Sequence, residues 1–172
     1  HQNKPDIGAA IVRKWFDQEG VDAVVDIANS GVALAVSQIA REKNKVFLGT
    51  GLASSDLTGK ACSPNTFHWV YDTYSVSHGT GGALVKAGGD SWFFLTADHA
   101  FGHALERDTS AIVRTNGGTV AGSVKHPLNT SDFSSFLLQA QSAKTKVIGL
   151  ANAGSDMINA VKQASEFGIT AN

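Results

Sequence analysis

The sequence predicts an α/β fold of doubly wound parallel sheets that form parts of two lobes. Short apolar runs alternate with longer amphipathic stretches, which is the pattern of parallel strands joined by crossover helices. Because the runs are mostly apolar, helices are expected on both faces of each sheet. Residues 50–74 interrupt the alternation with turn-forming clusters and an aromatic run, and we expect the chain to cross between the lobes there.

Five strands are expected, each short and bounded by glycine or small polar residues. They cover residues 23–27, 46–49, 92–96, 119–124 and 146–150. The apolar residues between the first strands follow the period of a helix. This spacing predicts one helix over residues 8–16 and another over residues 32–40.

The second half of the chain carries two further helix signals. Apolar residues from Phe133 to Ala140 share one helical face, and Thr130 or Ser131 is expected to cap the exposed amides at its start. Gly168, which follows Phe167, is the expected stop signal of the last helix. The sequence therefore predicts helices that alternate with strands up to the end of the chain.

Composition narrows the range of partners. The 172 residues are 42% hydrophobic and 17% charged, with a formal net charge of −1, so the chain can form a core but offers no concentrated basic surface for nucleic acid. A run of about 18 apolar residues, long enough to span a bilayer, is absent from the sequence, and no membrane insertion is expected. The single cysteine, Cys62, excludes a disulfide within the chain.

A glycine-containing run after the second strand has two interpretations. Gly49, Gly51 and Ser54 occupy the spacing of a dinucleotide-binding loop, whose glycines let a pyrophosphate approach a helix N-terminus. Ser54 stands at the third glycine position and turn residues follow, which favours an ordinary turn at the end of a strand. We therefore expect no cofactor.

Metal binding and catalysis have little support in the sequence. His99, His103 and Glu106 have helical spacing, but the glutamate does not lie between the histidines and no distant third ligand is indicated. A Gly-x-Ser-x-Gly motif follows none of the strands, and Cys62 has no nearby base. We expect neither a metal site nor an enzyme.

The candidate binding residues follow from the topology. In open parallel sheets, ligands bind outside the carboxyl ends of the strands. The loops at these ends hold small residues that leave room for a ligand, hydroxyl and amide groups that suit a carboxylate, and rings that stack. The expected ligand-binding residues are Asn29, Ser30, Gly51, Leu52, Ala53, Ser54, Tyr74, His99, Phe101, Asn152 and Asp156.

Five segments, taken in order, resemble the middle of type I periplasmic solute-binding proteins of the leucine/isoleucine/valine-binding family, which serve ABC importers. The resemblance covers nearly all of the chain. The segments are NKPDIGAAIVRKWFDQEGVDAVVD, IAREKNKVFLGTG, WFFLTADHAFGHALE, NTSDFSSFLLQAQ and VIGLANAGSDMINAVKQASEFG.

The resemblance implies a two-lobed protein of which this chain is a central piece. Residues 1–70 would form part of the first lobe and residues 71–172 part of the second, with the crossover around residues 67–74. The implied partners are a small carboxylate ligand and an ABC permease in the inner membrane. The implied location is periplasmic, or extracytoplasmic with a lipid anchor, and the full-length protein would be a monomer.

The family's ligand contacts map onto several of the candidate residues. Ser30, Gly51 and Ala53 match the positions that hold a carboxylate in the first lobe. Ala53 lacks the usual hydroxyl, so either Ser54 would replace it or the carboxylate would be held differently. Phe101 matches an aromatic wall in the second lobe. Asn152 and Asp156 lie near the positions of a strand-end tyrosine and an ammonium-binding acid.

The resemblance also suggests a class of ligand. The segments HWVYDTY and TADHAFGHALE are more similar to the branch of the family that takes up aromatic carboxylates, such as hydroxycinnamate- or benzoate-like acids. The alternatives are a branched-chain or other amino acid on the same fold and a ligand-sensing receptor domain. A Rossmann-like enzyme is the remaining alternative.

Overall fold

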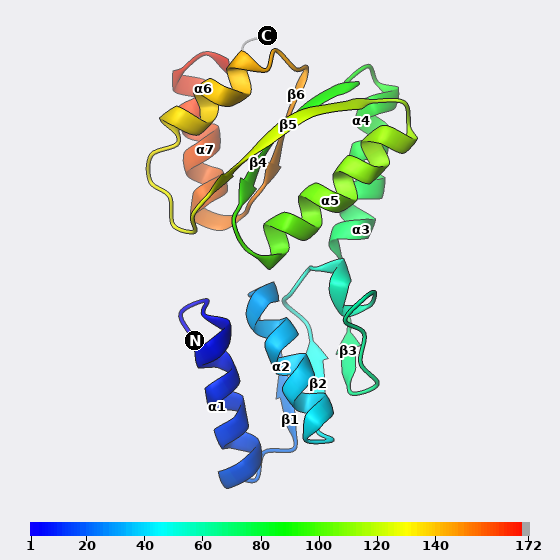
Figure 1. The fold of residues 1–172 in the computed structure, drawn as a ribbon, viewed down its shortest axis with the longest axis vertical. Coiled ribbons are helices and arrows are strands. Elements are labelled where there is room, and N and C mark those ends of the chain that lie inside the picture. The colour runs from blue at the N-terminus through cyan, green and yellow to red at the C-terminus, as the bar shows by residue number, and fades with distance from the viewer. Residues whose placement is uncertain (170–172) are drawn as a thin grey trace. The chain divides into compact units, whose positions relative to one another are not determined.

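The structure, a computed structural model, describes residues 1–169 and separates into two compact units, His1–Thr73 and Tyr74–Asn172. Among the described residues, each unit contains one three-stranded parallel sheet flanked by helices (Figure 1). The predicted α/β class with parallel sheets is therefore confirmed. In this part of the chain, no helix is both long and apolar enough to cross a membrane.

Unit 1 packs two helices on one face of a sheet with strand order β1-β2-β3. Val24 and Phe47 point from the strands into this layer and are buried against side chains of α1 and α2 such as Val12 and Val36. The elements are α1 (Pro5–Gln18), β1 (Ala23–Val25), α2 (Ser30–Glu42), β2 (Val46–Gly49), the 3₁₀ helix η1 (Ser55–Leu57) and β3 (Thr66–His68).

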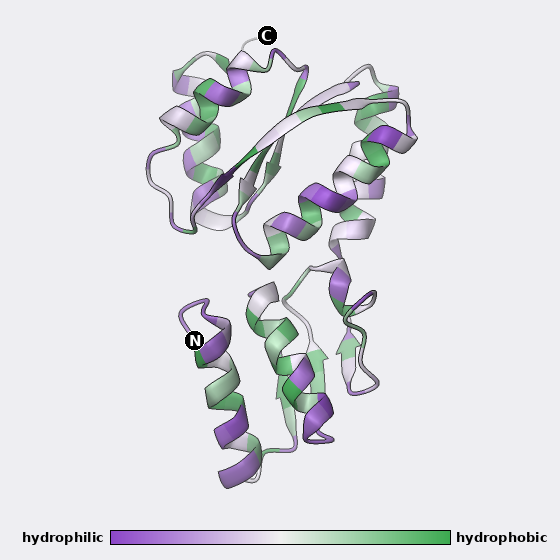
Figure 2. Cartoon of the chain, viewed as in Figure 1, coloured by the Kyte–Doolittle hydropathy of each residue, from purple (hydrophilic) through white to green (hydrophobic). Residues whose placement is uncertain are grey.

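The other face of this sheet is apolar and exposed. Val25, Leu48 and Phe67 lie side by side across the three strands and are 57%, 37% and 48% exposed. Figure 2 shows the hydrophobic colouring of β1 and β2. The buried core of unit 1 is therefore built from one face of its sheet, whereas parallel sheets are usually covered on both faces.

Unit 2 is doubly wound, with strand order β5-β4-β6. On one face Phe93 and Leu95 of the central strand pack against α6 and α7. On the other face Trp92 and Phe94 pack in a second cluster that contains Val113 of α5. Figure 1 shows α5 on one side of this sheet and α6 and α7 on the other. The elements are α3 (Thr73–Val76), the π-helical segment η2 (Ser77–Gly81), α4 (Gly82–Lys86), β4 (Ser91–Ala97), α5 (Ala100–Thr115), β5 (Thr119–His126), α6 (Ser134–Ser142), β6 (Val147–Ala151) and α7 (Gly154–Glu166).

The five predicted strands are present, with changes at their ends. The strand expected over 23–27 ends at Val25, because Asp26 and Ile27 adopt left-handed backbone conformations with φ of 79° and 70°. The strand expected over 119–124 continues to His126. A sixth strand, β3, lies where only an extended crossover was expected, and it pairs in parallel with β2.

The helix predictions need two corrections. Neither Thr130 nor Ser131 caps α6: the helix begins at Ser134, whose amide donates to Asp132 Oδ1 at 2.9 Å, and the Thr130 hydroxyl donates to the Pro127 carbonyl instead. The helical segment that includes α3 and α4 was not predicted. Gly168, with φ of 67°, follows the last residue of α7 and its cap, as predicted.

Candidate ligand-binding site

At the carboxyl ends of the unit 2 strands, three buried polar side-chain atoms have no hydrogen-bond partner. They are His99 Nδ1, Asn152 Oδ1 and Asp156 Oδ1, and in residues 1–169 they are the buried side-chain nitrogen and oxygen atoms that lack a hydrogen bond. His99 follows β4, while Asn152 and Asp156 follow β6. Because an unpaired buried polar group costs free energy, this clustering points to a site that a ligand completes.

His99 is the residue before the first turn of α5, and its ring lies beside Phe101. The two ring centroids are 6.0 Å apart with planes inclined by 30°. Burial lowers the pKa of His99 below its ordinary value of 6.5, and the neighbouring His103 lowers it further, against the opposing effect of Asp156. The two rings therefore offer a neutral, partly buried surface on which a planar ligand can stack.

The lowered pKa of His99 makes stability depend on pH. The unfolded chain takes up a proton at His99 near pH 6.5, whereas the folded protein does so only at lower pH. As pH falls below 6.5, the unfolded state binds more protons, so the free energy of unfolding decreases until the folded pKa is reached. We expect His99→Gln to lose less stability than the unaltered protein between about pH 7.5 and about pH 5.5, measured by thermal unfolding. Equal losses would contradict a buried, neutral His99.

Asn152 is held by a histidine that the sequence analysis missed. His126, the last residue of β5, is fully buried, and its Nε2 lies 3.1 Å from Asn152 Nδ2. Its Nδ1 lies 2.9 Å from the Pro127 carbonyl oxygen. The predicted strand stopped at Val124, and a strand extended by two residues would have placed His126 at the same edge as the other candidates.

Asp156 lies in the first turn of α7 and is buried. Its Oδ2 accepts a hydrogen bond from the backbone amide of Asn129 at 3.2 Å, which leaves Oδ1 as the unpaired atom. Asn129 presents its amide from a left-handed backbone conformation with φ of 62°. The last residue of β5 therefore orients Asn152, and the loop after β5 orients Asp156.

The histidines and glutamate with helical spacing do not converge on one point. His103 Nε2 lies 2.7 Å from Asp98 Oδ1, and Glu106 Oε2 accepts from the Thr96 hydroxyl at 2.6 Å. Within residues 1–169, no group of three or more His, Cys, Asp or Glu side chains is placed to hold a metal ion. The geometry thus gives these side chains separate partners.

In unit 1 the candidate residues at the start of α2 form a hydrogen-bonded junction. Asn29 caps α2 by accepting from the Val32 amide at 3.0 Å, and Ser30 Oγ accepts from the Ser54 amide at 3.3 Å. Ser54 Oγ in turn accepts from the Asp56 amide at 3.3 Å. These contacts bring Asn29, Ser30 and Ser54 together and give each a structural role.

The remaining unit 1 candidates contribute mainly backbone. Leu52 is buried and its carbonyl lies 2.9 Å from His68 Nε2, while the Ala53 carbonyl accepts from the Thr73 amide at 2.7 Å. A side chain at Gly51 would collide with the Asp26 carboxylate, which would have to move to make room. Their contact with a ligand stays a prediction.

Tyr74 lies on α3 in unit 2, and its ring packs on His78 with centroids 3.9 Å apart. Tyr74 is more than half exposed, so part of its surface is available to a ligand or to solvent. The contact with His78 gives Tyr74 a partner outside the cluster of unpaired polar atoms. Its part in binding therefore also stays a prediction.

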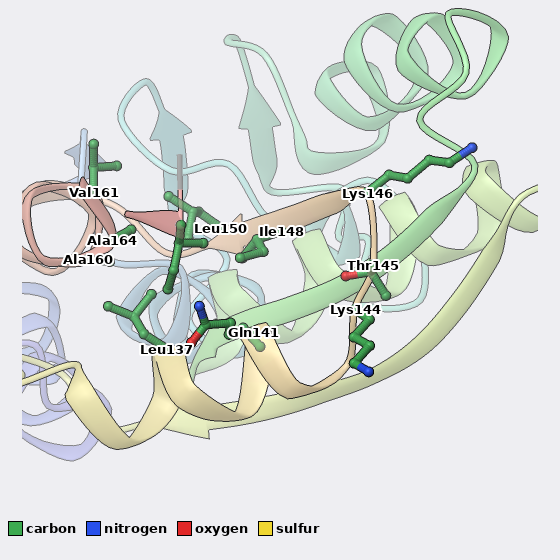
Figure 3. Close-up of a pocket in the computed structure, with 12 residues that line it drawn as sticks. Leu137, Gln141, Lys144, Thr145, Lys146, Ile148, Leu150, Ala160, Val161 and Ala164 are labelled. Carbon is green, nitrogen blue, oxygen red and sulfur yellow. The ribbon is translucent and has the colours of Figure 1, made fainter. Parts of the chain in front are cut away.

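A cavity without these residues lies elsewhere in unit 2. It has a volume of about 710 Å³ and is lined by α6, α7, β6 and the loop at residues 144–146, with Leu137, Ile148 and Ala160 on its walls (Figure 3). Its loop residues precede β6, whereas Asn152 and Asp156 follow it. The cavity and the unpaired polar atoms are therefore separate features of unit 2.

A family model and solved structures that are similar to this chain all describe periplasmic binding proteins. A family model described as periplasmic binding protein matches residues 1–172. A periplasmic binding protein from Burkholderia mallei is 55% identical, with a TM-score of 0.97 over 99% of this chain and 45% of that chain. A branched chain amino acid ABC transporter periplasmic ligand-binding protein from Burkholderia xenovorans LB400 is 35% identical, with a TM-score of 0.76 over 98% of this chain and 45% of that one.

A more distant structure shares the fold. A solute binding protein of an ABC transporter from R. palustris, solved in complex with benzoate, is 22% identical with a TM-score of 0.88, over 95% of this chain and 46% of that one. The comparison with curated proteins gave no match. The chain spans slightly less than half the length of these solved structures and has the type I periplasmic binding protein fold over that span. The chain belongs to the periplasmic binding protein family.

Proposed function

We propose that this chain is part of the substrate-binding component of an ABC importer and captures an aromatic carboxylate, hydroxycinnamate- or benzoate-like, between two lobes. The observation that carries the proposal is the cluster of unpaired buried atoms on His99, Asn152 and Asp156. Phe101 stacks beside this cluster and supplies an apolar ring surface. A planar ring with a polar substituent satisfies both features.

The first lobe would hold the carboxylate. Ser30, Gly51 and Ser54 lie around the start of α2, where hydroxyl groups and backbone amides suit an anion. Residues 1–70 would then supply the anion-binding wall, and residues 71–172 the aromatic and polar wall. Ala53 and Leu52 would line the first wall through their backbone.

The named ligands of related folds support this class. Besides the benzoate complex, a second solute binding protein from R. palustris was solved with 4-hydroxybenzoate and is 20% identical to this chain. These proteins indicate that the fold accommodates small aromatic acids. In the second lobe, hydroxyl-binding and ring-stacking groups surround a neutral histidine and the buried carboxylate of Asp156.

An amino acid is the second candidate, and one observation favours it. Asp156 keeps one buried carboxylate oxygen unpaired, which an ammonium group would complete with a charge-assisted hydrogen bond. The Burkholderia xenovorans relative is described as a branched chain amino acid protein. Asp156 would then contact the ammonium, and Phe101 would pack against the side chain.

Binding would act through hinge closure without chemical change. A ligand that touches both lobes stabilises the closed state by its difference in affinity between the two states. An ABC permease in the inner membrane would recognise that closed state. The protein would work as a monomer in the periplasm, or outside the cytoplasm on a lipid anchor.

A thermal-shift screen of the full-length protein tests the proposal. A ligand present at about 100 times its Kd adds about 2.7 kcal/mol of stability, which raises the melting temperature by several degrees. We expect this shift with benzoate, 4-hydroxybenzoate or p-coumarate, and none with leucine or valine. A shift with leucine or valine alone would replace the aromatic acid with an amino acid.

A further inference from the structure

We infer that His126 is a positioning residue that sets the polarity of the binding site. By holding the Asn152 amide, it turns the carbonyl oxygen of Asn152 toward the ligand and so selects aromatic acids that carry a hydroxyl group. This inference rests on the proposed function and specifies its ligand.

The partners of His126 determine its tautomer. Nδ1 lies 2.9 Å from the Pro127 carbonyl oxygen, which only accepts, so Nδ1 carries the proton of the neutral ring. Nε2 is then an acceptor. The Asn152 atom that lies 3.1 Å away must therefore be the amino group, which donates to Nε2. This assignment follows from hydrogen-bond chemistry, which is how amide orientations have to be decided.

The ring of His126 is held in place by aromatic packing. It is fully buried, and Phe133 meets it edge-on with centroids 4.8 Å apart. Phe136 lies 6.0 Å away at 63°. A ring enclosed in this way cannot turn to exchange its two nitrogens without disturbing the core that Phe133 shares with α6 and α7.

These contacts leave hydrogen-bond acceptors, and not donors, on Asn152 and Asp156 for a ligand. The side-chain amino group of Asn152 donates to His126, so Asn152 presents Oδ1 to the ligand, and this atom is buried and unpaired. Asp156 also presents an unpaired oxygen, Oδ1, because the backbone amide of Asn129 donates its hydrogen bond to Oδ2. Two acceptors require a ligand that donates. Benzoate has only acceptors, whereas the phenolic hydroxyl of 4-hydroxybenzoate supplies a donor.

The discrimination should be large enough to measure. A site built to hydrogen-bond a hydroxyl group rejects an analogue without it, because buried polar groups are left unpaired. We expect the unaltered full-length protein to bind 4-hydroxybenzoate at least about 10-fold more tightly than benzoate in calorimetric titrations. The ratio of the two dissociation constants is the readout, because a general loss of fold would weaken both ligands together.

Substitutions at position 126 test the positioning role. In His126→Leu the Asn152 amide loses its restraint, and we expect the ratio to fall toward 1 while benzoate affinity changes little. His126→Gln can accept from the Asn152 amino group through its own carbonyl and should restore part of the ratio. Phe136→Leu is the matched control, because it alters the packing around His126 but keeps the hydrogen bond to Asn152.

The outcomes separate the two proposals. An unaltered protein that binds both acids equally, or a folded His126→Leu variant that keeps the full ratio, would overturn the inference and leave the proposed function standing. Binding of neither acid would overturn both. If His126→Leu does not fold, the ¹⁵N chemical shifts of the His126 ring in the unaltered protein decide: a protonated Nδ1 supports the inference, and a protonated Nε2 contradicts it.

Discussion

Replacing Phe94 with alanine is expected to lower the free energy of unfolding of unit 2 by about 3–5 kcal/mol. Phe94 is 1% exposed in the central strand and stacks on Trp92 with ring centroids 5.8 Å apart. Its ring also fills the space above Gly149, where a side chain would collide with it. The substitution therefore removes a large buried surface and leaves a cavity that neighbouring strands cannot close. Urea-induced unfolding followed by far-ultraviolet circular dichroism measures the effect.

Phe167→Ala provides the matched control for Phe94→Ala. Phe167 caps the end of α7 and is 46% exposed, so the same chemical change removes less buried surface. We expect the control to lower the free energy of unfolding by less than about 1.5 kcal/mol. Equal destabilisation by the two substitutions would contradict the position of Phe94 in the core of unit 2.

Replacing Phe101 with alanine is expected to weaken binding of an aromatic acid by about 1–3 kcal/mol, or roughly 5- to 150-fold in Kd. The reason is the loss of the ring that stacks beside His99 where α5 begins. Phe101→Leu keeps an apolar side chain without the ring, so its affinity should lie between those of the unaltered protein and Phe101→Ala. Calorimetric titration of the full-length protein with 4-hydroxybenzoate measures each affinity.

Phe167→Ala also controls this second experiment, because Phe167 follows the last turn of α7 whereas Asp156 lies in its first turn. A helix of this length separates its two ends by about 20 Å, so affinity should remain unchanged. Unchanged affinity in Phe101→Ala would remove Phe101 from the site. A loss in the Phe167→Ala control would show instead that binding responds to general destabilisation.

Local patterns predicted much of the fold, and tertiary contacts decided the rest. The strand at Val46–Gly49 was predicted with its observed bounds because it is apolar and ends at a glycine. The first strand was predicted too long, since Asp26 and Ile27 adopt a conformation usually reserved for glycine or asparagine. β3 escaped prediction because its three residues gain strand structure only through pairing with β2.

The helical segment before β4 shows the limit of propensity. Ser77–Gly81 contains two glycines in five residues, which argues against a helix from sequence alone. Packing against α5 outweighs that preference: a side chain added at Gly81 would contact Thr109, and the Ser77 hydroxyl lies 2.9 Å from that of Thr109. A small-residue segment thus becomes helical because it fits closely against a neighbouring helix.

The candidate site was predictable to the extent that topology determines which residues lie at the strand ends. The rule that ligands bind beyond the carboxyl ends of parallel strands selected His99, Asn152 and Asp156, and each carries an unpaired buried atom. His126 was missed because the predicted β5 ended two residues early. The hydrogen bonds that occupy Asn29 and Ser30 depend on distant parts of the chain, and sequence patterns do not reveal them.

The most direct test of the account is calorimetric titration of the full-length protein with benzoate, p-coumarate and leucine in parallel. If the strand-end loops form a site for aromatic acids, at least one of the two acids binds with a measurable Kd, and Asp156→Asn or Phe101→Ala weakens that binding. Leucine then gives no heat beyond dilution. Saturable binding of leucine, with none of either aromatic acid, would contradict the account.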